Sequence, residues 1–502
     1  MSKKGTMFYQ AILLTVANLL LRMVSLGFQV YLSGRIGAAG IGLLQLTLSV
    51  CSLGLTAAMG GIRTATMYLT AAEIGKKQQG TPESVLSSCY LYSILCSTLV
   101  CIPTYIFAPT IARLWIGDIR VLPAIRIFAG FLPVTCLVGV LTGYYTAAGR
   151  VKTLVCIEVA EQLVSMGATV TFLMLFAGDD PGASCACIIG GSCAAGVVSL
   201  LCLLLFKGRS PQRIPEEGSV MKQLLPVAVP LAFADIFRMG ISTAENLIVP
   251  RRLALFSGAA PALAAYGQVC GMVFPVLMFP ASILYSLAEL LIPELSRCAA
   301  GGRKKRTGYL TARSLRVAYV YGLGAGGLLF TLAQGLGVLL YDNPEVGRLL
   351  KTYALLVPML YADAITDAVI KGMGQQVVSV RYNTLTSFLD VVFLWVLLPK
   401  MGLRGYYLSF VVTHGINFFL SIRRLHKVTA YHPSPRGILR GLPPWLGSMA
   451  VCALLPNAAT IGGAVFFGAV YLLVFLLSAV LSGLLRKEDL RWLRGLVRGR
   501  AG

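Results

Sequence analysis

Apolar stretches of about 20 residues recur along the whole chain of 502 residues, and they constrain its fold more than any other feature. A helix of that length crosses a hydrocarbon core of about 30 Å, and inside lipid only helices and closed barrels satisfy their backbone hydrogen bonds. The sequence therefore predicts an all-α polytopic membrane protein. We expect about fourteen transmembrane helices, near residues 7–33, 40–62, 86–107, 122–147, 153–177, 184–206, 223–250, 265–292, 312–340, 352–373, 381–398, 404–422, 439–456 and 460–485.

Basic residues concentrate in alternate loops, and this distribution predicts the orientation of the chain. We assign to the cytoplasmic side Lys3, Lys4, Lys76, Lys77, Arg303 to Arg306 and the tail from Arg486 to Arg500. The opposite loops hold far fewer basic residues. The positive-inside rule then predicts a multi-pass protein of the plasma membrane with both termini in the cytoplasm. The net charge of +23 could suggest nucleic acid, but the positions of the charges are more informative than their sum. We interpret the basic run from Arg303 to Arg306 as a cytoplasmic loop that contacts anionic lipid rather than as a nucleic-acid site or an import signal.

The two halves of the chain are related by an internal repeat. Arg22-Met23 recurs as Arg238-Met239, at an offset of 216 residues. A second offset of 225 residues aligns Gly42 with Gly267, Pro133 with Pro358, Gly149 with Gly374 and Gly190 with Gly415. Both halves begin on the same side of the membrane and contain six helices, so we expect an axis along the membrane normal to relate them.

The repeat predicts two lobes that face each other across a central cavity. We expect an N-lobe of helices 1–6 at residues 1–206, a cytoplasmic linker at 207–222 and a C-lobe of helices 7–12 at 223–427. Residues 428–502 would form helices 13 and 14 and a basic cytoplasmic tail. Prolines inside the predicted spans favour kinks or bends, because proline removes a backbone donor: Pro133, Pro226, Pro230, Pro275, Pro280 and Pro358.

Three arginines lie in the apolar part of the sequence, at Arg22, Arg63 and Arg238. An arginine at the centre of a membrane helix costs roughly 2.5 to 3.5 kcal/mol on insertion scales, so it usually faces an interior cavity. This pattern indicates a transporter. Acidic residues outnumber these bases and have two open interpretations, neutralisation of the arginines or binding of a coupling proton or sodium ion. The charged residues concerned are Glu158, Glu161, Asp235, Glu245, Asp363, Asp367, Lys371 and Asp390.

Nothing in the sequence indicates a resident cofactor or metal. The 13 cysteines lie mainly within apolar stretches, where they act as small hydrophobic residues. Cys185 and Cys187 lack the nearby histidines of a zinc site. The sequence has no GxxxxGK[ST] phosphate loop, so we expect no direct use of ATP.

Four short motifs resemble the multidrug/oligosaccharidyl-lipid/polysaccharide exporter superfamily, and within it the stage V sporulation protein B group of polysaccharide-lipid transporters. The motifs are Asn18-Leu-Leu-Leu-Arg22, Tyr31-Leu-Ser-Gly-Arg-Ile-Gly-Ala-Ala-Gly-Ile-Gly42, Gly60-Gly-Ile-Arg63 and Lys371-Gly-Met-Gly-Gln-Gln376. The resemblance implies two six-helix lobes arranged as a V around a central cavity. It also implies a lipid-tail groove at the additional helix pair.

The resemblance further implies a flippase that moves an undecaprenyl-diphosphate-linked saccharide, a peptidoglycan precursor or polysaccharide unit, from the inner to the outer leaflet by alternating access. Arg22 and Arg63 match the flippase arginines that bind diphosphate, and guanidinium groups suit that role. Arg238 departs from the pattern, which places the C-lobe arginine on the next helix. Membrane lipids, and glycosyltransferases or polymerases of the same pathway, are the implied partners.

Two other functions stay open. A multidrug or cation antiporter of the same superfamily is favoured by the number of acids and disfavoured by Arg22 and Arg238. A membrane glycosyltransferase would normally require a catalytic loop outside the bilayer, and the loops here are short. Export of a diphosphate needs no nucleotide, because moving each negative charge outward across an inside-negative membrane yields about 2.3 kcal/mol per 100 mV. We therefore expect a transporter rather than an enzyme.

Overall fold

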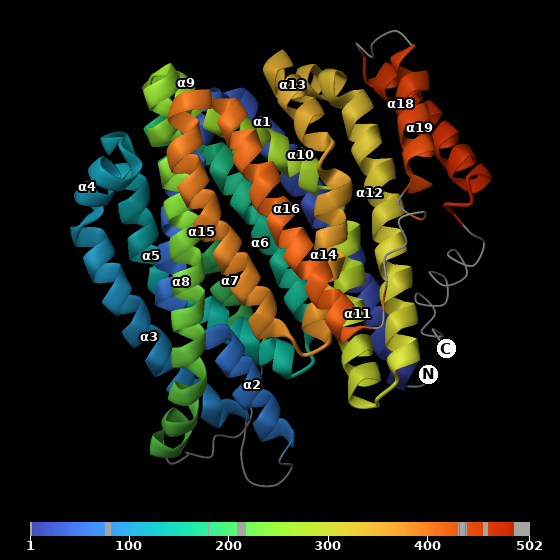
Figure 1. Ribbon diagram of the computed structural model, residues 1–502. Coiled ribbons are helices and arrows are strands. Elements are labelled where there is room, and N and C mark those ends of the chain that lie inside the picture. Colours follow the sequence, from blue (N-terminus) through green and yellow to red (C-terminus); the bar gives the residue numbers. More distant parts are fainter. Residues whose placement is uncertain are drawn as a thin grey trace. The chain divides into compact units, whose positions relative to one another are not determined.

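The computed structural model describes residues 3–75, 82–178, 180–207, 217–429, 431, 437, 439–454 and 460–485. Every regular element within these ranges is helical, and none is a strand (Figure 1). Among the described residues, 10 helices are long and apolar enough to cross a membrane, or up to 11 when one bent pair counts as a single span. The all-α polytopic membrane fold is therefore confirmed. The expected number of fourteen helices is not, and stays a prediction.

Helix α1 (Lys3–Met59) accounts for part of the difference in number. The apolar segment Leu19–Glu73 counts as one span of 55 residues, although a continuous helix of that length would measure roughly 80 Å. Gly37 breaks α1 with φ 70° and ψ 175°, between the two helices expected there. Helix α18 (Leu442–Ala453), with 12 residues, is too short to count as a span.

The chain forms two compact units. Unit 1 comprises Met1–Leu21, Ile36–Ala254 and Ala259–Gly267, and unit 2 comprises Arg22–Arg35, Leu255–Gly258 and Gln268–Gly502. The units differ from the expected lobes at the first helix of each half: Arg22–Arg35 belongs to unit 2, whereas the helix after the expected linker belongs to unit 1. Residues 208–216 of that linker lie outside the described residues, as do Lys76, Lys77 and the basic tail.

Local packing explains why each of these two segments belongs to the unit opposite to the expected one. In unit 2, the side-chain amide of Gln29 donates to the carbonyl of Gly271 at 3.0 Å. In unit 1, Gly61 has a φ of +70°, and a Cβ atom there would lie 2.8 Å from the carbonyl oxygen of Ala228. Leu224 and Ala228 are fully buried in the same apolar cluster as Ile62. The helix that begins the second half therefore packs on the elements of the first.

Unit 1 is built from long helices connected by short ones. The long helices are α2 (Ile62–Gly75), α3 (Pro82–Ile106), α5 (Leu122–Ala147), α6 (Val151–Phe172), α7 (Pro181–Leu205) and α8 (Glu217–Ser257). The short ones are α4 (Ala108–Thr110), η1 (Ile111–Ile116), η2 (Ile119–Val121), η3 (Leu173–Ala177) and α9 (Ala259–Tyr266). Helix α5 packs against α2, α3 and α7, and α7 also packs against α6 (Figure 1).

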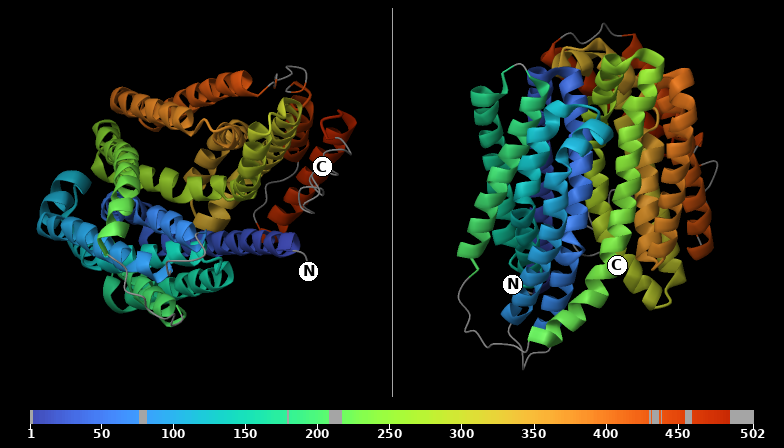
Figure 2. Two further views of the ribbon diagram at one scale, coloured as in Figure 1. Left: turned by 90° about the horizontal axis from the view of Figure 1, so that it is seen from below. Right: turned by 90° about the vertical axis from the view of Figure 1, so that its left-hand side faces the viewer.

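The described part of unit 2 contains long helices and one pair of shorter helices that meet at a bend. Its elements are η4 (Gly267–Val273), α10 (Phe274–Met278), α11 (Ala281–Ala300), α12 (Lys304–Tyr341), α13 (Pro344–Ala354), α14 (Val357–Gly372), α15 (Gln376–Met401), α16 (Leu403–Val428), α18 and α19 (Ile461–Leu481). Helices α18 and α19 lie side by side next to α12 (Figure 2).

The six prolines fall into two groups. Pro275, Pro280 and Pro358 stand where a helix begins, and α13 and α14 meet at 55° just before Pro358. Pro133, Pro226 and Pro230 lie inside the continuous helices α5 and α8. Proline therefore accompanies a break in three of the six positions at which the sequence favours a kink or bend.

Candidate functional site

Arg22 lies on the surface of unit 2, in an apolar segment long enough to cross the membrane. Its guanidinium carbon stands 5.6 Å from the centroid of the Tyr285 ring on α11. Within the described chain, Arg22 forms neither an ion pair nor a hydrogen bond. The ring face attracts the cation without using its N–H donors. Those donors stay available for a ligand.

Asp363 on α14 influences the same tyrosine, because both Asp363 and Arg22 act electrostatically on Tyr285. The amide nitrogen of Asn417 on α16 donates to one carboxylate oxygen of Asp363 at 3.0 Å. The second carboxylate oxygen of Asp363 and the amide oxygen of Asn417 are buried, and neither has a hydrogen-bond partner among the described residues. A buried acceptor without a donor is costly, so this pair has room for one more proton or cation.

Two further acids of unit 2, Asp367 and Asp390, have partners within the protein. Asp367 forms an ion pair with Lys371 at 2.5 Å, one helical turn away, and also accepts a hydrogen bond from the hydroxyl of Ser379. Asp390 is 6% exposed and accepts hydrogen bonds from Ser409 at 2.6 Å and Thr413 at 3.1 Å. These partners engage both oxygens of Asp367 and one oxygen, Oδ1, of Asp390.

Arg63 lies in unit 1, on α2, and lines a cavity of about 460 Å³. Glu158 and Glu161 of α6 line the same cavity together with Gln162, and Arg63 and Glu158 are near enough for their charges to interact. Helices α5 and α7 complete the wall, with Ser192 of α7 among the lining residues. The structure thus brings Arg63 together with the two glutamates, and places Arg22 in the other unit.

Arg238 is the third arginine expected to bind substrate. It lies on α8 in unit 1 and forms an ion pair with Asp235 at 3.2 Å, one helical turn earlier. The Arg238 side chain is 71% exposed, so this pair contributes little to stability. Glu245 is half-buried further along α8.

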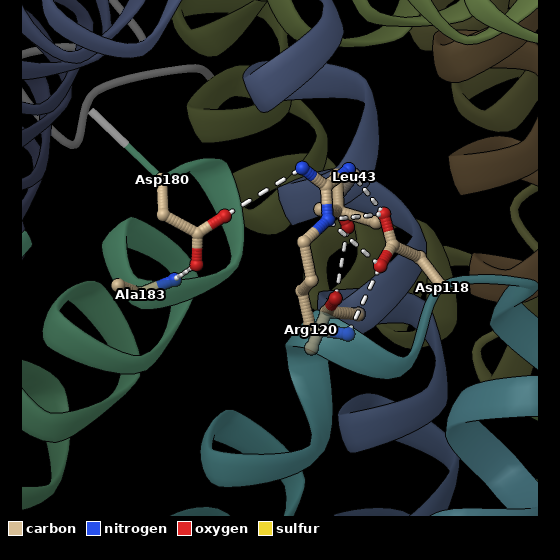
Figure 3. A network of polar contacts seen from close by, with 6 residues as sticks. Leu43, Asp118, Arg120, Asp180 and Ala183 are labelled. Carbon is tan, nitrogen blue, oxygen red and sulfur yellow. Dashed lines mark hydrogen bonds and ion pairs between the residues drawn. The ribbon is translucent and has the colours of Figure 1, made fainter.

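A polar network that the sequence did not single out connects two loops of unit 1 (Figure 3). The Arg120 guanidinium lies between two carboxylates, with a hydrogen bond of 2.6 Å to Asp118 and an ion pair of 3.6 Å with Asp180. Asp180 in turn accepts the backbone N–H of Ala183 at the start of α7. The Arg120 hydrogen bond holds the pKa of Asp118 below its usual value. Both acids follow predicted spans, but nothing local indicated that one arginine would meet them.

An apolar cavity of about 350 Å³ lies in unit 2, where the expected lipid-tail groove would be. Leu472, Phe475 and Leu476 of α19 line one side, and Val320 and Gly324 of α12 line the other. Arg316 is the charged residue among the lining residues. Among the described residues, no group of three or more His, Cys, Asp or Glu side chains is arranged to hold a metal ion.

Comparison with known sequences relates most of the chain to one family. Residues 9–298 match the family model described as polysaccharide biosynthesis protein. Stage V sporulation protein B of Bacillus subtilis strain 168 is 24% identical over 425 residues, which cover 81% of each chain. Sporulation protein YkvU of the same organism is 30% identical over 128 residues, 25% of this chain and 28% of the other.

Solved structures with the same fold come from the predicted superfamily. The lipid II flippase MurJ in an inward closed conformation matches with a TM-score of 0.68 and 12% identity, over 94% of this chain and 98% of that one. An inward-facing multidrug resistance MATE family transporter of the MOP superfamily matches with a TM-score of 0.64 and 14% identity, over 82% and 98% of the two chains. The resemblance predicted from the four short motifs is confirmed at the level of the fold.

Proposed function

The chain belongs to the polysaccharide biosynthesis protein family, and from this premise we propose that it transports a lipid-linked saccharide across the plasma membrane. The substrate is a saccharide joined to undecaprenyl diphosphate, and it moves from the inner to the outer leaflet by alternating access. Both termini lie in the cytoplasm. The protein lowers the barrier to this movement and makes or breaks no covalent bond, so it is a transporter rather than an enzyme.

The observation that carries this proposal is the state of Arg22. Its guanidinium is held against Tyr285, but within the described residues no carboxylate neutralises it. A diphosphate presents several anionic oxygens, and a guanidinium binds such oxygens through two parallel N–H bonds. Arg22 therefore has both the charge and the unused donors that a diphosphate requires. Arg63 and Arg238 each stand near acids, so we assign them weaker contributions.

The apolar cavity between α12 and α19 supports the lipid part of the substrate. Its wall is formed by aliphatic and aromatic side chains such as Leu328, Leu472 and Phe475. An isoprenoid tail needs an apolar surface of this kind, because burial of apolar area is favourable by about 25 cal/mol per Å². We assign this cavity to the tail and Arg22 to the diphosphate.

The inside-negative membrane potential supplies energy for this direction of transport, at about 2.3 kcal/mol per charge and 100 mV. The acids of unit 2 then divide by their partners. Lys371 balances the charge of Asp367, and two hydroxyls of α16 donate hydrogen bonds to Asp390. Asp363 is the candidate for binding a coupling proton or sodium ion, because one of its oxygens is buried without a donor among the described residues.

The test is transport of a fluorescent lipid-linked oligosaccharide by purified protein in liposomes. We expect Arg22→Ala to lower the transport rate at least tenfold and Arg22→Lys to restore only part of it, because lysine keeps the charge but loses the planar fork. Arg35→Ala is the matched control, since Arg35 is an exposed arginine further along the same helix. Transport by Arg22→Ala at the rate of the wild type would rule out this role of Arg22.

A second function, export of organic cations, is favoured by the cavity of unit 1. Two carboxylates there face one arginine, which leaves an excess of negative charge that suits a cation. The same liposomes tested with cationic dyes separate the two functions. Dye export without lipid movement would favour the antiporter, and lipid movement without dye export would favour the flippase.

A further inference from the structure

The cavity of unit 1 contains charged groups without a hydrogen-bond or ion-pair partner among the described residues. Arg63, Glu158 and Glu161 line it, and none of the three forms a hydrogen bond or an ion pair with another described residue. Both glutamates are half-buried within an apolar segment long enough to cross the membrane. A charged side chain inside the membrane costs free energy unless it is paired or faces a water-filled cavity. Such residues are therefore commonly part of a functional site. Three open charges in one cavity therefore point to a ligand.

The charges in the cavity do not cancel. One guanidinium faces two carboxylates, which leaves one net negative charge when both glutamates are ionised. The carboxylates lie three residues apart on α6, so they share one face of the helix and repel each other. Neutral groups that line the cavity can act as acceptors, among them Gln162 and the hydroxyls of Ser165 and Ser192, which lie 3.4 Å apart. This arrangement favours a ligand with a positive charge.

Three other occupants fit less well. A diphosphate carries two negative charges and would meet the net negative charge of the glutamates, in contrast to the site at Arg22. A bare metal ion is disfavoured by the size of the cavity, about 460 Å³, because one water molecule occupies only about 30 Å³ of liquid. A purely apolar molecule would leave the charged groups unsatisfied. The volume instead lies within the range of roughly 300 to 1,000 Å³ that is typical of small-molecule sites.

We propose that this cavity binds an amino sugar through its free ammonium group. The ammonium has three N–H donors, which bind the carboxylates of Glu158 and Glu161 and a serine hydroxyl. Arg63 donates to hydroxyl oxygens of the same sugar. The amino sugar is either a free molecule or the head group of the transported lipid, and the second source rests on the proposed function.

Binding of free sugars to the purified full-length protein tests the site directly. Glucosamine carries a charged ammonium at C2, and N-acetylglucosamine carries a neutral amide with an added acetyl group at the same position. We expect glucosamine to bind the wild type at least tenfold more tightly by calorimetry, and the variant Glu158→Gln/Glu161→Gln to lose this preference. Glu345→Gln should keep it, because Glu345 is an exposed acid of α13 in unit 2 that pairs with Arg348.

Three results would overturn the proposal: equal affinity of the wild type for the two sugars, no measurable binding of glucosamine, or an unchanged preference in the Glu158→Gln/Glu161→Gln variant. A merely structural role of the glutamates would not produce a preference for the charged amine. Thermal unfolding of the double variant without ligand shows whether it is folded. Should it be unfolded, the single variant Glu161→Gln replaces it with the same expected loss of preference.

Transport in liposomes then identifies the source of the amine. Two lipid-linked saccharides are compared that differ only in acetylation of one amino group. A faster rate for the free amine, lost in the double variant, identifies the head group as the ligand. Equal rates for both lipids, together with preferential binding of free glucosamine, identify a free amino sugar. If neither lipid moves while the binding preference is retained, the flippase function fails and the amine site stands.

Discussion

The polar cavity of unit 1 and two acids of unit 2, Asp367 and Asp390, contain similar residue types with different partners. In unit 2, Asp367 has Lys371 and Ser379, and Asp390 has two hydroxyl donors. In unit 1, Glu158 and Glu161 line a cavity with Arg63, and none of the three has a hydrogen-bond or ion-pair partner among the described residues. Satisfied carboxylates hold helices together, whereas unsatisfied ones leave free energy for a ligand.

The two sets of acids differ because the neighbouring helices place their hydroxyl groups differently. Helix α16 places Ser409 and Thr413 one turn apart, so both hydroxyls reach the single carboxylate of Asp390 on α15. Helix α7 places the Ser192 hydroxyl 3.4 Å from Ser165 of α6, and among the described residues neither glutamate of α6 accepts a hydrogen bond from it. The pair α15 and α16 therefore gives the acid Asp390 hydrogen-bond donors, whereas the pair α6 and α7 gives its glutamates none among the described residues.

The largest effect should come from Asp390, which is buried in unit 2. Asp390→Ala removes the acceptor of two hydrogen bonds at a site that is 6% exposed. Because hydrogen bonds to a charged group contribute roughly 1.5 to 3 kcal/mol, we expect the free energy of unfolding to fall by about 2 to 4 kcal/mol. Denaturation in detergent micelles measures this change. A loss below about 0.5 kcal/mol would contradict the view that this acid stabilises unit 2.

The next effect concerns the contact that positions Arg22. Tyr285→Leu removes the ring under the guanidinium, whereas Tyr285→Phe keeps it. An exposed cation–π contact contributes about 0.5 to 1 kcal/mol, so transport of the lipid-linked saccharide should slow about two- to fivefold in the leucine variant. The phenylalanine variant should keep the rate. Tyr105→Leu is the control, because it removes a similar contact, with Arg126, in unit 1; an equal slowing there would show that the effect is not specific to Arg22.

The sequence predicts the membrane class, the positions of most helices and the residue types of the candidate sites. It predicts local pairs, such as the spacing of Asp367 and Lys371 on one helix face, because helix geometry sets them. It does not predict that Asp363, on the same face, turns to Asn417, which lies 54 residues away. Nor does it predict that Arg22 belongs to unit 2, because the packing partners Tyr285 and Gly271 carry no pattern that relates them to the first helix.

A smaller effect concerns Arg120, a charged residue of unit 1 that does have ion-pair partners. Its guanidinium lies between the carboxylates of Asp118 and Asp180, so charges without partners are not a general property of unit 1 (Figure 3). The Arg120 side chain is 52% exposed, so Arg120→Gln should lower the free energy of unfolding by only about 0.2 to 1 kcal/mol at pH 7. The measurement is unfolding of both proteins as a function of pH.

The sign of the pH dependence follows from Asp118, whose pKa is held below its usual value by Arg120. A lowered pKa in the folded state means that the ion pair stabilises the protein above the usual pKa of aspartate, about 3.9. The stabilisation is lost as the pH falls through the pKa of the folded state. The difference between the wild type and Arg120→Gln should therefore close in acid. A difference that persisted at pH 2 would show that Arg120 acts through packing instead of charge.

The smallest expected effect, and the one that separates the two regions most directly, is on stability in the cavity of unit 1. Glu158→Gln/Glu161→Gln removes like charges three residues apart on α6, which destabilise a helix by roughly 0.2 to 0.5 kcal/mol. We expect the free energy of unfolding to rise by about that amount, in contrast to the loss from Asp390→Ala. A fall of the size expected for Asp390→Ala would mean that the glutamates stabilise unit 1, and the two regions would then differ in geometry but not in role. An unchanged or higher stability, accompanied by loss of amine binding, would mean that these carboxylates are kept for a ligand, since the fold does not need them.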